Sequence, residues 1–198
     1  MPRPSQADDR RKRLLPIVAR AFAELGYRRT TTAELAKRCQ VRENVLYRLW
    51  RDKKAMFVAS IEFVYALSAE TWQRLLAEGD DGKGPAERLL QYESEHHGES
   101  GLQRLVFAGL SETNDPAIRQ ALRTMYRRFH RFIGEQISAY RNDDRRTPQP
   151  DAALSAWAVI GLGTLASIVQ ELELLKSGER KRFMADVGHL LIEGRPAR

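Results

Sequence analysis

The sequence contains a single cysteine, Cys39, among its 198 residues. An intramolecular disulfide and a cysteine-based metal cage are therefore excluded. We expect Cys39 to be a small core residue rather than a redox sensor. The sequence also lacks a glycine-rich phosphate loop, a nucleophile elbow and a cluster of metal ligands, which argues against the commonest enzyme chemistries. We therefore expect no enzyme, with no catalytic residue, no cofactor and no metal site.

Long uncharged runs are scarce as well. The exception is residues 152–169, which carry no charged side chain and approach the minimum length of a membrane-spanning helix. This run contains two serines, two glycines and a threonine, and Glu171 and Glu173 follow it at once. We expect it to form a helix buried in an interface, with no membrane partner. The charged N-terminus lacks the apolar stretch of a secretory signal, which predicts a cytoplasmic protein.

Positive charge is concentrated in the first quarter of the chain. Residues 1–54 hold 15 Lys or Arg against 6 Asp or Glu, whereas the rest of the chain holds 18 against 20. Basic side chains near phosphates gain affinity by releasing condensed counterions, so the asymmetry favours a polyanionic partner. A membrane surface is an alternative, but it would need large exposed apolar groups that this segment lacks.

Helical periodicity runs through the sequence, and no segment shows a convincing strand pattern. Glycine, proline and asparagine mark the breaks between periodic segments. The composition, with 42% hydrophobic and 30% charged residues, is that of an ordinary globular chain of one or two domains. We predict an all-α fold of about nine helices, two of them short and within residues 31–51, and the others at residues 8–25, 53–78, 85–97, 101–113, 116–142, 151–175 and 179–192.

Residues 29–54 have the pattern of two short helices joined by a tight turn. Thr31 and Glu34 have the spacing of a capping box that would begin the first helix. Apolar residues then recur at helical spacing, and the polar side chains Glu43, Asn44, Tyr47, Arg48 and Arg51 remain on the outer face of the second helix. This is the layout of a helix-turn-helix, whose second helix enters the major groove of DNA. By pattern alone, a plain helical hairpin with a solvated charged face is the alternative.

The run from Leu14 to Phe57 resembles the DNA-binding domain of the tetracycline-repressor-like (TetR) family of bacterial regulators. The resemblance covers about 45 residues and rests on the following ordered set: the apolar first helix (Leu14, Leu15, Ile17, Val18, Ala21, Phe22), Glu24-Leu25-Gly26-Tyr27, Thr31-Thr32, Leu35-Ala36, Val41, Leu46-Tyr47, Trp50, Lys53 and Ala55-Met56. It implies a three-helix DNA-binding domain at residues 1–52 and a larger helical dimerisation and ligand-binding domain at residues 53–198.

The resemblance also implies a function. TetR-like proteins are sequence-specific transcriptional regulators, usually ligand-responsive homodimeric repressors of a near-palindromic operator. The expected partners are double-stranded DNA, a second copy of the chain and a small-molecule effector. One alternative is a basic helical protein that binds acidic partners, and another is a TetR-like regulator that activates transcription or has no effector.

The sequence departs from the family pattern in the turn and in the second helix. Gln40 stands where a turn glycine is usual, which predicts either a different turn or a positive φ at Gln40. Arg42 replaces the customary small N-cap residue. Val45 and Leu49 replace a hydroxyl residue and a histidine that relatives often use to contact DNA. Base preference is therefore not carried over from relatives.

By resemblance, Thr32, Tyr47 and Lys53 would touch phosphates and set the register on DNA. Base edges would be reached by the charged and amide side chains of the second helix, and Val45 would touch a thymine methyl. The predicted DNA-binding residues are Thr31, Thr32, Arg42, Glu43, Asn44, Val45, Tyr47, Arg48 and Lys53. The basic run at residues 10–13 would either add backbone or minor-groove contacts or form a solvated start to the first helix.

The last two helices are the expected dimer surface, with intradomain packing as the alternative. One helical stripe and a glycine that permits close approach define it: Trp157, Ile160, Gly161, Thr164, Leu165, Ile168 and Gly188. Two recognition helices about 34 Å apart would fit one turn of DNA, and the operator would be a near-palindrome.

An effector pocket is implied by the resemblance. Its candidate lining residues are aromatic or imidazole side chains of the larger domain, with a simple core as the alternative: Trp72, Tyr92, His96, Phe107, Tyr126 and Phe129. Glu93 and the adjacent histidines at 96 and 97 are weak candidates for a metal site, because adjacent histidines point to different helix faces and at most one shares a face with Glu93.

Overall fold

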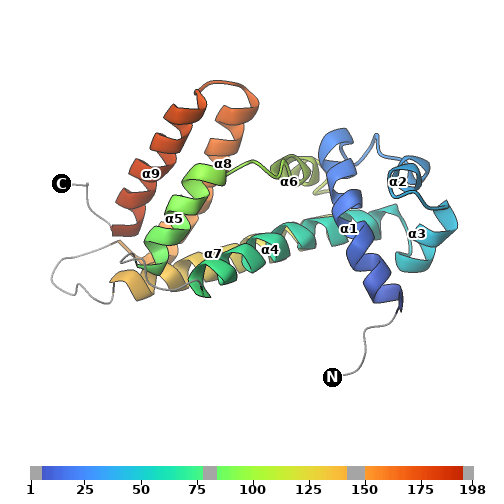
Figure 1. Ribbon diagram of the computed structural model, residues 1–198, viewed down its shortest axis with the longest axis horizontal. Helices are drawn as coiled ribbons and strands as arrows, with labels where there is room; N and C mark the ends of the chain where they lie inside the picture. The colour runs from blue at the N-terminus through green and yellow to red at the C-terminus, as the bar shows by residue number, and fades with distance from the viewer. Residues whose placement is uncertain (1–5, 78–83, 142–149, 194–198) are drawn as a thin grey trace. The chain divides into compact units, whose positions relative to one another are not determined.

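The structure is a computed structural model that describes residues 6–77, 84–141 and 150–193. These residues form nine helices and no strand (Figure 1): α1 (Gln6–Leu25), α2 (Thr32–Arg38), α3 (Glu43–Leu49), α4 (Lys53–Ala77), α5 (Pro85–His96), α6 (Gln103–Leu110), α7 (Pro116–Arg141), α8 (Ala152–Glu171) and α9 (Ser177–Glu193). The predicted all-α class is confirmed.

The helix ends differ most from prediction at the C-terminus of α8. The sequence pattern predicts a helix to residue 175, whereas α8 ends at Glu171. Glu173 adopts a φ of 53°, and the Leu174 amide donates to the Val169 carbonyl (2.9 Å). A left-handed residue after a helix is usually glycine. Because this position holds a glutamate, the sequence pattern did not indicate that the helix ends here.

The described residues divide into two compact units. Unit 1 lies within Met1–Leu67 and Gly101–Met125, and unit 2 lies within Ser68–Ser100 and Tyr126–Arg198. The division falls inside the long helices α4 and α7. The functional division into residues 1–52 and 53–198 stays a prediction.

The core of unit 1 is built around aromatic rings from α1 and α4. Phe22 packs edge-on against Phe57 with ring centroids 4.9 Å apart, and Tyr27 lies 4.8 Å from Phe57. Leu35 of α2 and Leu46 of α3 are fully buried. The short helices α2 and α3 are therefore held by tertiary packing, because seven-residue helices are only marginally stable alone.

The core of unit 2 joins four helices. Buried residues from α5, α7, α8 and α9 form one cluster: Ala86, Leu90, Ile137, Ala156 and Ile192. Beside it, the buried guanidinium of Arg141 donates to the Ile192 carbonyl (2.7 Å), the Leu191 carbonyl (2.7 Å) and Ser155 Oγ (2.9 Å). Burial among neutral acceptors lowers the pKa of Arg141 below its usual value. Arg141 thus joins the C-terminal end of α9 to α8.

Helix α8 is the one helix in residues 6–77, 84–141 and 150–193 whose length and composition would allow a membrane span. One such helix is weak support for a span, because buried helices of soluble proteins meet the same criterion. Helices α8 and α9 pack side by side (Figure 1).

Candidate nucleic-acid interface

The first short helix, α2, begins at the predicted N-cap, whereas the carboxylate of Glu34 pairs with Arg38 instead of completing the predicted capping box. Thr31 is its N-cap, and the Glu34 amide donates to Thr31 Oγ1 (3.1 Å). The Glu34 carboxylate accepts a hydrogen bond from Arg38 Nε (2.8 Å), which lowers the pKa of Glu34. Arg38 also pairs with Glu24 of α1. The helix is thus fastened to α1 through side chains as well as through its apolar face.

The turn between α2 and α3 contains a left-handed residue. Gln40 has a φ of 54°, so the second of the two expected departures, a positive φ at Gln40, is confirmed. Cys39, just before it, is buried, and burial raises the pKa of its thiol. Because the thiolate is the reactive form, this environment agrees with a core role for Cys39.

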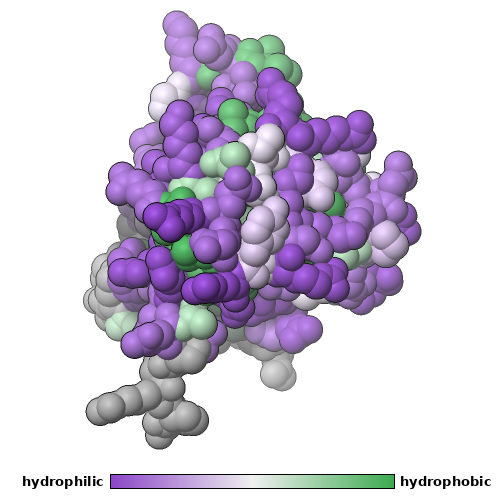
Figure 2. All heavy atoms as spheres, turned by 90° about the vertical axis from the view of Figure 1, so that its right-hand side faces the viewer, coloured by the Kyte–Doolittle hydropathy of each residue, from purple (hydrophilic) through white to green (hydrophobic). Residues whose placement is uncertain are grey.

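Helix α3 buries one face and exposes the other. Leu46, Leu49 and the following Trp50 are buried. The exposed side chains are those that the sequence assigns to DNA contacts: Arg42, Glu43, Asn44, Tyr47 and Arg48. Val45 is half-buried between the two faces. Figure 2 views the molecule from the end that carries α2 and α3 in Figure 1, and its surface is mostly hydrophilic.

The charged and amide groups of this face have unused hydrogen-bonding capacity. Within the described residues, no hydrogen bond or ion pair involves the side chains of Arg42, Glu43, Asn44 or Arg48. Arg42 also provides no side-chain cap to α3, as its replacement of a small N-cap residue predicts. We refer to Arg42, Glu43, Asn44, Tyr47 and Arg48 as the α3 outer face.

Two predicted phosphate contacts lie together at the edge of the α3 outer face. The Tyr47 hydroxyl donates to Thr32 Oγ1 (3.2 Å), which joins α3 to the start of α2. Lys53 lies elsewhere in the unit: its Nζ donates to the Tyr27 carbonyl (3.1 Å) and the Thr30 carbonyl (3.0 Å). One ammonium hydrogen of Lys53 remains for a further acceptor.

The segment between α6 and α7 is held to the loop before α2 and to the start of α4 by ion pairs that the sequence did not suggest. Arg28 Nε lies 2.7 Å from Glu112 Oε1, and Lys54 Nζ lies 2.8 Å from Asp115 Oδ2. The Lys54 hydrogen bond lowers the pKa of Asp115, and the same contact raises the pKa of Lys54. Part of the positive charge of residues 1–54 is therefore used inside unit 1.

Residues 19–60 match the family model of the bacterial regulatory proteins of the tetR family. The match covers the helix-turn-helix and parts of the helices beside it, so this part of the chain is similar to the N-terminal domain of that family. A comparison with curated proteins returned no match.

Solved structures with the same fold cover nearly the whole chain. A TetR-family transcriptional regulator from Cytophaga hutchinsonii has a TM-score of 0.80 at 14% identity, with 100% of both chains covered. The transcriptional regulator FadR from Bacillus subtilis, in complex with stearoyl-CoA, has a TM-score of 0.71 at 14% identity over 92% of this chain and 98% of that one. A protein from Saccharomonospora viridis, solved in complex with choline, has a TM-score of 0.72 at 17% identity over 93% and 96%. At such identities the likeness concerns the fold of the tetR-family regulators.

The second unit of this chain exposes an apolar face on α8. The large side chains that remain exposed there are Leu154 (67%), Trp157 (47%), Leu165 (45%), Ile168 (37%) and Leu172 (61%). Their spacings of three, eight, three and four residues place them on one side of α8 and of its C-cap residue, Leu172. We refer to these five residues as the α8 apolar face.

The predicted dimer residues are only partly on the α8 apolar face. Gly161 is exposed and lies among the side chains of the α8 apolar face, whereas Ile160 and Thr164 are half-buried. Gly188 of α9 is buried beneath Leu90, whose Cδ1 would lie 2.2 Å from a Cβ at that position. The small size of Gly188 is therefore required for packing of α9 on α5. Leu154 and Leu172 extend the face and are residues that the sequence analysis missed, although they continue the same helical stripe.

The candidate pocket residues form separate aromatic contacts. Trp72 stacks on Phe132 (centroids 4.8 Å apart) and meets Phe129 edge-on (5.5 Å). Tyr92 and His96 stack on each other at 4.5 Å. Tyr126 is half-buried, and desolvation raises the pKa of its hydroxyl. These residues belong to unit 2, whereas the sixth candidate, Phe107, belongs to unit 1.

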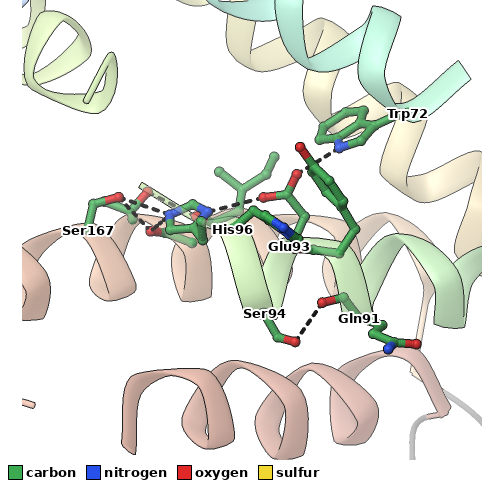
Figure 3. A network of polar contacts seen from close by, with 11 residues as sticks. Trp72, Gln91, Glu93, Ser94, His96 and Ser167 are labelled. Atoms are coloured by element: carbon green, nitrogen blue, oxygen red, sulfur yellow. Dashed lines mark hydrogen bonds and ion pairs between the residues drawn. The ribbon is translucent and has the colours of Figure 1, made fainter. Parts of the chain in front are cut away.

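A polar network connects α4, α5 and α8 within unit 2 (Figure 3). The Trp72 indole Nε1 donates to Glu93 Oε1 (2.7 Å), and Glu93 Oε2 lies 3.2 Å from Nδ1 of His97. The other imidazole nitrogen, Nε2, lies 2.8 Å from the Gly163 carbonyl and 3.0 Å from Ser167 Oγ. His97 is thus the one histidine of the adjacent pair that shares a face with Glu93. In the part of the chain that the structure describes, no three His, Cys, Asp or Glu side chains are grouped so that they could hold a metal ion.

Proposed function

We propose that this chain is a transcriptional regulator that binds double-stranded DNA through the α3 outer face. The observation that carries this proposal is a tetR-family helix-turn-helix whose second helix presents charged and amide groups without a partner in the described residues. An arginine suits guanine O6 and N7, an asparagine suits adenine, and a glutamate accepts from cytosine N4. Val45, half-buried beside them, suits a thymine methyl.

The phosphate contacts would come from the start of α2, from Tyr47 and from Lys53. Thr31, Thr32 and Tyr47 carry hydroxyl groups close to the α3 outer face, and Lys53 keeps one ammonium hydrogen beyond its two carbonyl contacts. Contacts of this kind orient the protein on the duplex without distinguishing bases. Together with the base contacts they would define both register and sequence.

We infer that the regulator acts as a homodimer formed through the α8 apolar face. An exposed stripe of large apolar side chains marks an interaction site more often than bare surface does. A single seven-residue recognition helix contacts few base pairs, and a two-fold dimer doubles that number. Its half-sites would be about one helical turn apart, and the operator would be a near-palindrome. A protein that acts on DNA in this way would be cytoplasmic and would need neither a catalytic residue nor a cofactor.

Repression released by a small molecule is the regulatory mode that we propose. The larger domain at residues 53–198 would bind the effector, with Trp72, Tyr92, His96, Tyr126 and Phe129 as the candidate lining in unit 2. A ligand that prefers a state unable to hold both half-sites would release DNA by shifting populations. FadR holds stearoyl-CoA and the Saccharomonospora viridis protein holds choline. Because these two ligands share almost no chemistry, the fold alone does not determine the effector.

Selection of bound fragments from a random duplex library tests this function. We expect one near-palindromic sequence to be enriched, with binding that weakens steeply as salt rises. The matched control is Arg48→Ala, which should lose preference at one position of each half-site and keep its other preferences. Equal retention of all duplexes, or retention of acidic proteins in preference to DNA, would favour the alternative of a basic helical interaction protein.

A further inference from the structure

The four residues of the basic run at residues 10–13 differ in their contacts. The Arg11 guanidinium donates two hydrogen bonds to the Leu49 carbonyl, from Nε (3.1 Å) and from Nη2 (2.6 Å). Leu49 is the last residue of α3. Arg10, Lys12 and Arg13 are exposed, and within the described residues none of them has a hydrogen bond or an ion pair. Arg11 therefore differs from its neighbours by binding the helix that carries the α3 outer face.

The acceptor of Arg11 is a group that α3 cannot satisfy by itself. The last four carbonyls of a helix have no partner further along the helix. In α3 the Trp50 amide donates to the Leu46 carbonyl (2.8 Å), whereas the Leu49 carbonyl lies at the very end. A cation at a helix C-terminus also interacts favourably with the helix dipole, and a hydrogen bond from a charged donor is stronger than a neutral one.

The guanidinium is itself oriented. Nη1 of Arg11 lies 3.4 Å from Asp8 Oδ1, one turn earlier on α1. The side chain is 44% exposed, so solvent reaches it while three of its nitrogens are directed at protein acceptors. At the opposite end of α3, Arg42 provides no side-chain cap. The contact from α1 thus fixes one end of a seven-residue helix whose other end lacks such a side-chain bond.

We propose that Arg11 is a positioning residue for DNA recognition: it fixes the C-terminal end of α3 against α1 and does not neutralise a phosphate. This inference rests on the proposed function. Base recognition by paired hydrogen bonds requires an aligned helix, whereas non-specific binding depends mainly on the number of phosphates neutralised. Loss of Arg11 therefore weakens operator binding and leaves non-specific binding and its salt dependence nearly unchanged.

The test compares Arg11→Met with Arg10→Met, because both changes remove one positive charge from the same turn of α1 and keep a good helix former. For Arg11→Met, we expect affinity for the selected operator to fall about tenfold, as for loss of a charged hydrogen bond, with an unchanged slope of log affinity against log salt. We expect Arg10→Met to bind the operator within about twofold of the wild type at moderate salt. Arg11→Lys, which keeps the charge and one donor direction, should recover part of the loss.

A second measurement does not depend on DNA. In the free protein, amide hydrogen exchange of Leu46 to Trp50 should be faster in Arg11→Met than in the wild type or in Arg10→Met, with the exchange of α2 unchanged. The inference is overturned if exchange in α3 is the same in all three proteins. It is also overturned if Arg11→Met lowers the salt slope by about one while it keeps the ratio of operator to non-specific affinity. A wild-type protein that prefers no duplex, but whose α3 exchange responds to Arg11→Met, would instead refute the proposed function alone.

Discussion

Two exposed helical surfaces of this chain have opposite chemistry. The α3 outer face presents guanidinium, carboxylate, amide and phenol groups, and the α8 apolar face presents four large aliphatic side chains and a tryptophan. A polar face with unused donors and acceptors loses little by remaining in water and gains from a partner with matching groups. An apolar face gains by leaving water with any apolar partner. In the function proposed above, α3 would therefore supply specificity and α8 would supply the strength of association.

A charge in the middle of the α8 apolar face should have the largest effect on association. Leu165→Glu should prevent dimerisation, because a carboxylate would lose its hydration without a partner. Operator affinity should then fall about a hundredfold or more, since each chain would hold a single half-site. Sedimentation equilibrium should report a monomer. Lys181→Glu, an exposed change on α9, should remain dimeric; a dimeric Leu165→Glu would remove α8 from the interface.

The next largest effect is expected for Arg141, which joins α8 to the C-terminal end of α9. Arg141→Met would leave the carbonyls of Leu191 and Ile192 without their buried donor. We expect a loss of about 2–4 kcal/mol in the free energy of unfolding, measured by urea titration. The exposed Arg182→Met on α9 should change stability by less than about 0.5 kcal/mol. Equal stability of the two variants would mean that the Arg141 contacts contribute nothing net.

A change on the α3 outer face should affect recognition without affecting association. Arg48→Ala should cost about 1–3 kcal/mol of binding free energy at one operator position, while the protein remains dimeric. Competition binding with single-base operator variants measures this, and Arg20→Ala, an exposed arginine of α1, is the control. A uniform loss over all operator variants would make Arg48 a phosphate contact.

Loss of the ion pair between Lys54 and Asp115 should have the smallest effect, and that effect is on stability. These two charges are paired with each other, unlike the charged groups of the α3 outer face in the described residues. Because the pKa of Asp115 is lowered from 3.8, its contribution to stability is present above pH 3.8 and is lost as pH falls through the lower folded value. Because the pKa of Lys54 is raised from 10.5, its contribution is present below pH 10.5 and is lost as pH rises through the folded value.

Asp115→Asn keeps an oxygen at the N-cap position of α7, where Asp115 Oδ1 accepts from the Ala117 amide (2.8 Å). The melting temperature of the wild type should exceed that of Asp115→Asn between pH 5 and pH 9 by a constant small margin. The margin should shrink below pH 3.8 in thermal melts recorded at several pH values. A margin that grows as the carboxylate is protonated would contradict the contact.

Features that depend on neighbours in the sequence could be predicted. Thr31 caps α2 through an amide three residues away. The positive φ of Gln40 is one of the two outcomes predicted from the missing glycine. Features that depend on distant residues could not: Arg11 meets a carbonyl 38 positions away, and Arg28 meets Glu112 at a separation of 84.

Small residues show the same limit of sequence patterns. Gly161 and Gly188 both permit close approach of another helix, and the sequence gives no sign of which helix approaches. Gly161 is exposed on α8, whereas Gly188 is buried beneath Leu90 of the same chain. A helical stripe identifies an apolar face, but only the packed structure separates residues in intrachain contacts from residues that remain exposed.

Protection of guanine N7 from methylation in the selected operator tests most directly whether the α3 outer face contacts bases. We predict protected guanines in the major groove of two half-sites about one helical turn apart, and loss of one protected guanine in each half-site with Arg48→Ala. An operator protected only along its backbone, with every guanine N7 equally reactive in the free and the bound DNA, would contradict the assignment of α3.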